Sequence, residues 1–199
     1  MGELSKHATV LIDESLAGLK ARCWVQPSHF SQLELSTWWE QVAGSDVGWS
    51  QNDIRVFGKW HREPRLTAWW GPTYRYANVH WPERPMHGWI RDLNREVSDA
   101  AGFEFNAVLV NGYRNGQDTM GWHRDNEPEI DATCIASVSL GATRTFKIRD
   151  RRNQSVLNVE LGHGDLLVME NLQDVHEHSV PRRAKVKEPR MNFTFRRLV

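Results

Sequence analysis

Cysteine is nearly absent from this sequence. Cys23 and Cys134 are the only two among 199 residues. Two are too few for a disulfide framework, and their spacing matches no zinc-binding pair. We therefore expect a protein of a reducing, intracellular compartment, cytoplasmic in a bacterium or nuclear in a eukaryote.

Long apolar runs and an excess of one charge are also missing. No apolar run approaches the roughly 20 residues of a membrane-spanning helix, and residues 1–20 lack the pattern of a secretion signal. The net charge is zero, with 25 basic and 25 acidic residues, so no overall positive field indicates nucleic-acid binding. Residues 178–199 nevertheless carry seven Lys and Arg against the single acid Glu188. This basic end could contact an anionic partner or could protect the edge of a strand.

Two segments have the pattern of amphipathic helices. Residues 31–44 begin with a serine that can cap a helix and end with a glycine. Residues from about 86 to 101 repeat apolar side chains at helical spacing, and Gly102 can end that helix. Residues 1–20 show only weak periodicity, so we expect a loosely held end.

After Gly102 the sequence changes to short β-type runs separated by turns. The runs are FNAVLVNGY, CIASVSLG, RTFKIRD, VLNVEL, DLLVME and MNFTFRRL. Upstream, residues 54–71 contain two strand-like runs broken by Gly58 and by the Glu63–Pro64 pair. Many short strands at regular spacing are typical of a sandwich or barrel and not of parallel β/α units. We predict one α+β domain that is mainly β, with N-terminal helices and an antiparallel jelly-roll (double-stranded β-helix) core.

A candidate metal site begins with His123 and Asp125, which lie two residues apart. In an extended segment such residues point the same way, so both side chains can face one point inside a barrel. The pattern alone is weak, because two other pairs match it: His61 with Glu63, and His163 with Asp165. His163 lies between two glycines in a turn signature, and His61 lies in a charged loop with nothing later to pair with it.

A third metal ligand must come from elsewhere, and DVHEHSVPRR offers His176 and His178. These two are also two residues apart, so geometry alone leaves both open. Two His and one carboxylate would occupy one face of a metal and leave positions free, which suits Fe(II) oxygen chemistry. A zinc hydrolase could use similar ligands, so the ligands alone do not fix the reaction.

The C-terminal run EPRMNFTFRRL places Arg190 and Arg196 six residues apart, on one face of an expected strand. A strand that directs guanidinium groups inward requires a buried anion to balance them. Arg suits a dicarboxylate, because its planar fork makes paired hydrogen bonds. The alternative is a surface strand with a polar outer face, and His178 upstream favours the anion site.

These residues together resemble the AlkB family of Fe(II)- and 2-oxoglutarate-dependent nucleic-acid dealkylases, in its DNA-repair branch. The matching text is NGYRNGQDTMGWHRDNEPE, IASVSLGATRTF, GDLLVMENLQDVHEHSVPR and PRMNFTFR, with VFGKWHREPRLTAWWG upstream, over roughly residues 50–198. The resemblance selects His178 over His176, because HSVP stands where the family has its distal His. The iron ligands and catalytic residues that it implies are His123, Asp125 and His178. The 2-oxoglutarate contacts that it implies are Asn111, Tyr113, Arg190, Asn192 and Arg196.

The resemblance also implies a nucleotide-recognition lid over residues 50–84. An N-terminal extension with its helix (1–49) precedes this lid, and a helix with the jelly-roll dioxygenase core (85–199) follows it. The substrate contacts that it implies are Phe57, Arg65, Tyr74, Tyr76, Trp122 and Glu127. A base in a duplex must be flipped out and held between ring systems before its reacting atom can be reached.

The implied function is repair of alkylated DNA, or of RNA, in single- or double-stranded form. Fe(II), 2-oxoglutarate and O2 would oxidise an N-methyl group on adenine N1 or cytosine N3, with release of formaldehyde, succinate and CO2. The protein would act as a monomer and would not associate with a membrane. One alternative is an oxygenase acting on protein side chains or small molecules, and another is a non-catalytic nucleic-acid-binding module. Ala184, which interrupts a basic run, and the short hairpin RDRRNQSVLNVEL depart from relatives that grip duplex DNA.

Overall fold

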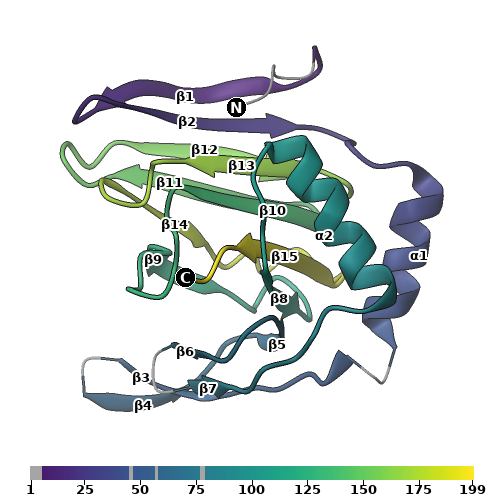
Figure 1. Ribbon diagram of the computed structural model, residues 1–199. Coiled ribbons are helices and arrows are strands. Elements are labelled where there is room, and N and C mark those ends of the chain that lie inside the picture. The colour runs from purple at the N-terminus through teal and green to yellow at the C-terminus, as the bar shows by residue number, and fades with distance from the viewer. Residues whose placement is uncertain (1–5, 45–46, 57, 77–78) are drawn as a thin grey trace.

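The fold consists of two antiparallel sheets that face each other (Figure 1). The computed structural model describes residues 6–44, 47–56, 58–76 and 79–199. In spatial order, the seven-stranded sheet contains β1 (Thr9–Leu16), β2 (Leu19–Gln26), β13 (Leu166–Glu170), β10 (Cys134–Gly141), β15 (Arg190–Arg196), β8 (Ala107–Tyr113) and β5 (Leu66–Trp70). The four-stranded sheet contains β12 (Val156–Leu161), β11 (Arg144–Asp150), β14 (His176–Val180) and β9 (Met120–His123). The predicted jelly-roll core is confirmed.

Two helices cover the outer face of the seven-stranded sheet (Figure 1). They are α1 (Gln32–Ala43) and α2 (Gly88–Ala101). Ser31 and Glu34 form a capping box at the start of α1, and Gly102 ends α2 in the left-handed region, with φ 62°. Both predicted helices are confirmed, although α2 begins two residues later than the apolar pattern indicated.

The side chains of β15 alternate between two environments, as the sequence predicted. Phe193 and Phe195 pack in the layer between the large sheet and the helices. Arg190, Asn192 and Arg196 are also buried, and two of these, Asn192 and Arg196, line the cavity between the sheets. The two-residue period of a strand therefore separates the apolar layer from the functional one.

The structure differs from the sequence prediction at the N-terminus and upstream of β8. Residues 9–26 form the hairpin β1–β2, which pairs with β13, although a loosely held end was expected over residues 1–20. Residues 53–70 contain three strands instead of two, because β3 (Asp53–Val56) and β4 (Lys59–Arg62) form a hairpin before β5. A second small hairpin, β6 (Tyr74–Tyr76) with β7 (Val79–Trp81), follows β5.

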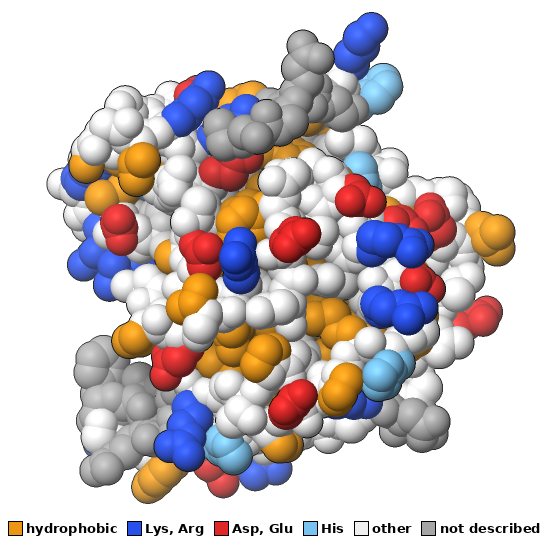
Figure 2. Space-filling model, in the orientation of Figure 1, with side chains coloured by type: hydrophobic (Ala, Val, Ile, Leu, Met, Phe, Trp, Pro, Cys, Tyr) orange, Lys and Arg blue, Asp and Glu red, His pale blue; other side chains and the backbone are white. Residues whose placement is uncertain are grey.

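Both cysteines are buried and free. No helix in the described ranges is long and apolar enough to cross a bilayer. Figure 2 shows basic and acidic side chains interspersed on one face of the molecule. Neither sign of charge dominates that face, which agrees with the zero net charge.

Candidate metal centre and cosubstrate pocket

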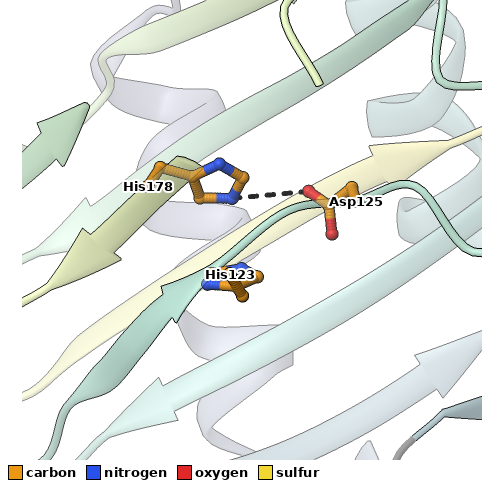
Figure 3. A group of neighbouring side chains, drawn as sticks. All are labelled: His123, Asp125 and His178. Carbon is orange, nitrogen blue, oxygen red and sulfur yellow. Dashed lines mark ion pairs between the residues drawn. The ribbon is translucent and has the colours of Figure 1, made fainter. Parts of the chain in front are cut away.

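Strands β9 and β14 bring two histidines together as direct cross-strand neighbours, His123 and His178. Asp125 follows the end of β9, and its Oδ2 lies 3.5 Å from Nε2 of His178 (Figure 3). One ligand atom from each of the three residues lies within 4.8 Å of the others. His176 does not join them, because its Nε2 lies 3.5 Å from Glu14 Oε1 on β1.

Hydrogen bonding and packing fix the two imidazoles. Nδ1 of His123 lies 2.9 Å from the carbonyl oxygen of Gly121. Since a carbonyl only accepts, Nδ1 carries the proton and Nε2 is left with its lone pair for a metal. The ring of Phe146 stacks on His178 at 5.2 Å between centroids, with 28° between the planes.

The electrostatic environment keeps His123 and Asp125 in the protonation states that a metal requires. Burial, followed by the neighbouring His178, lowers the pKa of His123 to about 3. Burial alone would raise the pKa of Asp125, but Arg196 and the two histidines hold it well below its usual range. The imidazole is therefore neutral and the carboxylate ionised at neutral pH, as ligands must be.

One carboxylate oxygen of the triad lacks a well-formed hydrogen bond. Apart from the approach of His178 Nε2 to 3.5 Å, Oδ2 of Asp125 is buried and accepts no well-formed hydrogen bond from any residue that the structure describes. A buried carboxylate oxygen without a partner is costly. A divalent cation among the three ligand atoms would satisfy it, so the donor set fits a metal of the facial-triad kind.

A cavity opens beside the triad between the two sheets. Its polar lining is Asn111, Tyr113, Ser137, Asn192, Thr194 and Arg196, and its apolar lining is Met120, Phe146, Met169 and Val180. Nη2 of Arg196 donates to Asp125 Oδ1 over 2.5 Å, so this arginine also orients a metal ligand. The amide nitrogen of Asn192 donates to Ser137 Oγ and to the carbonyl of Val138.

Arg190 lies under the ring of Tyr113, with its guanidinium carbon 5.3 Å from the ring centroid. Nη2 donates to Ser139 Oγ over 2.9 Å, whereas Nε and Nη1 have no hydrogen-bond partner in the described ranges. Burial lowers the pKa of this guanidinium to about 10, with Tyr113 acting in the opposite direction. A buried cation with unused donors is suited to bind a carboxylate through charge-assisted hydrogen bonds.

Comparison with known proteins agrees with this geometry. The family model of the 2OG-Fe(II) oxygenase superfamily matches residues 22–196. Alpha-ketoglutarate-dependent dioxygenase alkB homolog 3 of Bos taurus is 32% identical over 206 residues, which cover 97% of this chain and 71% of that protein. The chain belongs to the AlkB-like 2OG-Fe(II) oxygenases. This family assignment implies Fe(II), 2-oxoglutarate and O2 as cofactor and cosubstrates, and the triad and the buried arginine fit them.

Other relatives and one solved structure support the assignment. DNA oxidative demethylase ALKBH2 of Bos taurus is 41% identical over 162 residues, 73% of this chain and 57% of that protein. The human alkB homolog 3 is 36% identical over 180 residues, 84% of this chain and 63% of that protein. The chain thus spans less than two thirds of the length of these two relatives. The structure of OsALKBH1 superposes with a TM-score of 0.67 at 16% identity, over 95% of this chain and all of that one, and it bears on the fold alone.

The expected substrate residues of this oxygenase occupy different environments. Tyr74 is buried, and its ring stacks on Trp69 with centroids 5.0 Å apart. Trp122 is exposed on β9, where the guanidinium of Arg149 lies 4.3 Å from its ring centroid. Burial raises the pKa of Glu127, and a hydrogen bond with Tyr74 acts in the opposite direction. The contact between Tyr74 and Glu127 therefore links β6 to the segment that follows β9.

The structure does not describe the side chains of two further expected substrate residues, Phe57 and Tyr76. Phe57 lies outside the described residues, and for Tyr76 the structure describes the backbone in β6 and not the side chain. Their roles stay predictions.

Arg65 lies inside the protein and not at the surface, where a contact to nucleic acid was expected. It is buried, with 3% of its surface exposed. Nε donates to Asn111 Oδ1 over 2.7 Å, and Nη2 donates to Glu63 Oε1 over 3.1 Å. The geometry connects this arginine to the cosubstrate pocket, and its contact with substrate stays a prediction.

The two competing sequence pairs have other roles. Asp165 accepts hydrogen bonds from the backbone of Ser28 and of Gly162, and His163 accepts one from the backbone of Gly141. These contacts hold the turn between β12 and β13, as its glycines indicated. His61 is exposed on β4, a strand and not the loop that the sequence suggested.

Proposed function

We propose that this oxygenase demethylates N-alkylated bases, N1-methyladenine and N3-methylcytosine, in DNA or RNA. The observation that carries the proposal is the His123–Asp125–His178 triad at a cavity lined by Tyr113, against whose ring the buried Arg190 packs with unused donors. The name of the ALKBH2 relatives, DNA oxidative demethylase, supports nucleic acid as the substrate class. Residues 50–84 would act as the nucleotide-recognition lid, and the protein would work as a monomer.

The bound iron, with 2-oxoglutarate and O2, supplies the oxidation of the N-methyl group, while the protein binds and orients the reactants. His123, Asp125 and His178 would hold the metal and leave positions free for the cosubstrates. Arg190, whose guanidinium has unused donors, would bind one carboxylate of the cosubstrate. Asn111, Tyr113, Asn192 and Arg196 would contribute the polar wall of the cavity beside the triad. The products would be formaldehyde and the repaired base, together with succinate and CO2 from the cosubstrate.

Side chains at the cavity protect and orient the reacting group. The apolar wall of Met120, Phe146, Met169 and Val180 limits water at the metal. Glu127, partly buried beside the triad, is placed to exchange hydrogen bonds with the edge of a flipped base, and Trp122 offers a ring face for stacking. The protein would act in the cytoplasm of a bacterium or the nucleus of a eukaryote.

The decisive experiment measures formaldehyde released from oligonucleotides that contain a single N1-methyladenine or N3-methylcytosine. Single-stranded DNA, duplex DNA and RNA of the same sequence are compared, with the unmethylated strand and omission of 2-oxoglutarate as controls. We expect release that depends on both the methyl group and 2-oxoglutarate. Succinate formation with a peptide or small molecule, and none with any methylated strand, would instead favour the alternative oxygenase.

A further inference from the structure

Asp125 lies just beyond the strand that should hold it. The described pairing of β9 with β14 consists of His123 with His178 and Met120 with Val180. The backbone of Asp125 follows in a bend, outside the ladder. The carboxylate must nevertheless keep its place near the two imidazoles, because a metal site tolerates displacements of only about 0.5 Å.

The side chain of Gln173 supplies the missing hydrogen bond. Its Oε1 accepts from the backbone N–H of Asp125 over 3.0 Å, and both groups are buried. A weaker contact runs in the same direction, because Nη1 of Arg124 donates to the carbonyls of Gln173 and Asp174 over 3.4 Å and 3.3 Å. The loop before β14 therefore holds the segment that carries the carboxylate ligand through hydrogen bonds.

The amide of Gln173 has one orientation that satisfies its surroundings. Nε2 faces the thioether of Met169 at 3.9 Å, and a flipped amide would set its NH2 group against the N–H of Asp125. Only 2% of the residue is exposed, so water cannot replace either partner.

The loop around Gln173 is itself fixed at both ends. The backbone of His176 donates to Leu172 over 2.9 Å, and that of Asn171 donates to Thr133 over 2.8 Å. The same loop leads directly into β14, which carries His178. One turn therefore sets the position of two metal ligands, one through the chain and one through an amide.

We propose that Gln173 is a positioning residue of the metal centre, which holds Asp125 at the distance that the two histidines require. The proposal rests on the proposed function only in that the triad binds a divalent metal. Partners in the outer shell of a metal site change metal affinity by about 10–100-fold when they are removed.

The test uses Mn(II), a redox-stable substitute for Fe(II), titrated into the metal-free full-length chain and followed by electron paramagnetic resonance. We expect Gln173→Met, which keeps the shape and removes the acceptor, to weaken Mn(II) binding by about 10–100-fold. Gln173→Glu, which restores an oxygen acceptor, should recover most of that loss. The matched control is Gln41→Met on α1, an exposed position on the far side of the large sheet.

The outcomes separate the two proposals. A wild-type chain that binds no Mn(II) contradicts the proposed function itself. The role of Gln173 is contradicted if the wild-type chain binds Mn(II) and a folded Gln173→Met variant binds it with an affinity within twofold of the wild type. Equal weakening in the Met and Glu variants also overturns it, because the acceptor would then not matter.

A measurement on the wild type avoids any loss of folding in a variant. Amide hydrogen exchange of the metal-free chain should show the N–H of Asp125 protected relative to that of its exposed neighbour Asn126. Exchange of both amides at the same rate would mean that the hydrogen bond to Gln173 does not persist in solution.

Discussion

Arg65 Nε donates a 2.7 Å hydrogen bond to Asn111 Oδ1, across 46 residues of sequence. The bond fixes the side-chain amide of Asn111, so its NH2 group is the part left to face the cosubstrate pocket. Glu63 pairs with the same arginine at 3.1 Å and receives a hydrogen bond from Asn52 at 3.0 Å. A buried polar network therefore connects the start of the expected lid to the pocket.

Replacing Arg65 with Lys should separate its two candidate roles. A lysine cannot reproduce the fork that holds Asn111 and Glu63 together. Loss of about 1 kcal/mol at Asn111 corresponds to about a fivefold rise in the KM for 2-oxoglutarate. The KM for a methylated oligonucleotide should stay the same. The reverse result, a raised oligonucleotide KM alone, would support the substrate contact that the family resemblance implies.

Arg190→Lys should raise the KM for 2-oxoglutarate more strongly. The lysine brings a point charge but cannot make two parallel hydrogen bonds to a carboxylate. Loss of a charge-assisted hydrogen bond of about 1.5–3 kcal/mol predicts an increase of about 10–150-fold. Arg183→Lys, at an exposed arginine paired with Glu160, is the matched control. An unchanged cosubstrate KM in a folded Arg190→Lys protein would place the anion site elsewhere.

Asp125→Ala and Asp165→Ala distinguish the metal site from a sequence pair that resembles it. We expect Asp125→Ala to lose metal and turnover, since two histidines alone hold Fe(II) weakly. Asp165→Ala should keep both, but it loses two backbone hydrogen bonds and about 1–3 kcal/mol of stability. Iron content after anaerobic reconstitution and thermal melting measure the two effects. Exchanged behaviour of the two variants would invalidate the ligand assignment.

The sequence predicted those parts of the fold whose signals are local. The Ser31 cap and the stop at Gly102 act within a few residues of their helices, so both helices were found. The hairpin β1–β2 was missed because every residue of β1 is exposed or only partly buried, which blurs the two-residue period. Its stability comes instead from pairing of β2 with β13, about 140 residues later in the chain.

The same distinction holds for the site. His123 and Asp125 lie in one short run with a recognisable spacing, and the distal histidine stands in a motif. Gln173 and Ser139 act across 48 and 51 residues of sequence, on Asp125 and Arg190 respectively. A glutamine or serine with no spacing rule carries no signal for such a role, and only the folded geometry reveals it.

The stability of the metal-free chain should depend on pH through His123. Its pKa is about 3 in the folded state, against 6.5 for an unperturbed imidazole. Between these values the unfolded chain binds one more proton than the folded chain at this position. The free energy of unfolding therefore rises with pH across this window and falls as the pH is lowered, by up to about 1.4 kcal/mol per pH unit from this group.

Urea unfolding in EDTA at several pH values from about 4.5 to 7.5 tests this dependence, with His123→Gln as the variant. Loss of the imidazole should make the slope of stability against pH shallower by about one proton. His29 and His176 also have lowered pKa values, so a smaller slope of the same sign should persist. The low pKa of Asp125 affects stability only as the pH falls below about 4, the usual range of a carboxyl group. Parallel slopes for wild type and variant over the measured range would show that His123 is not held neutral by the fold.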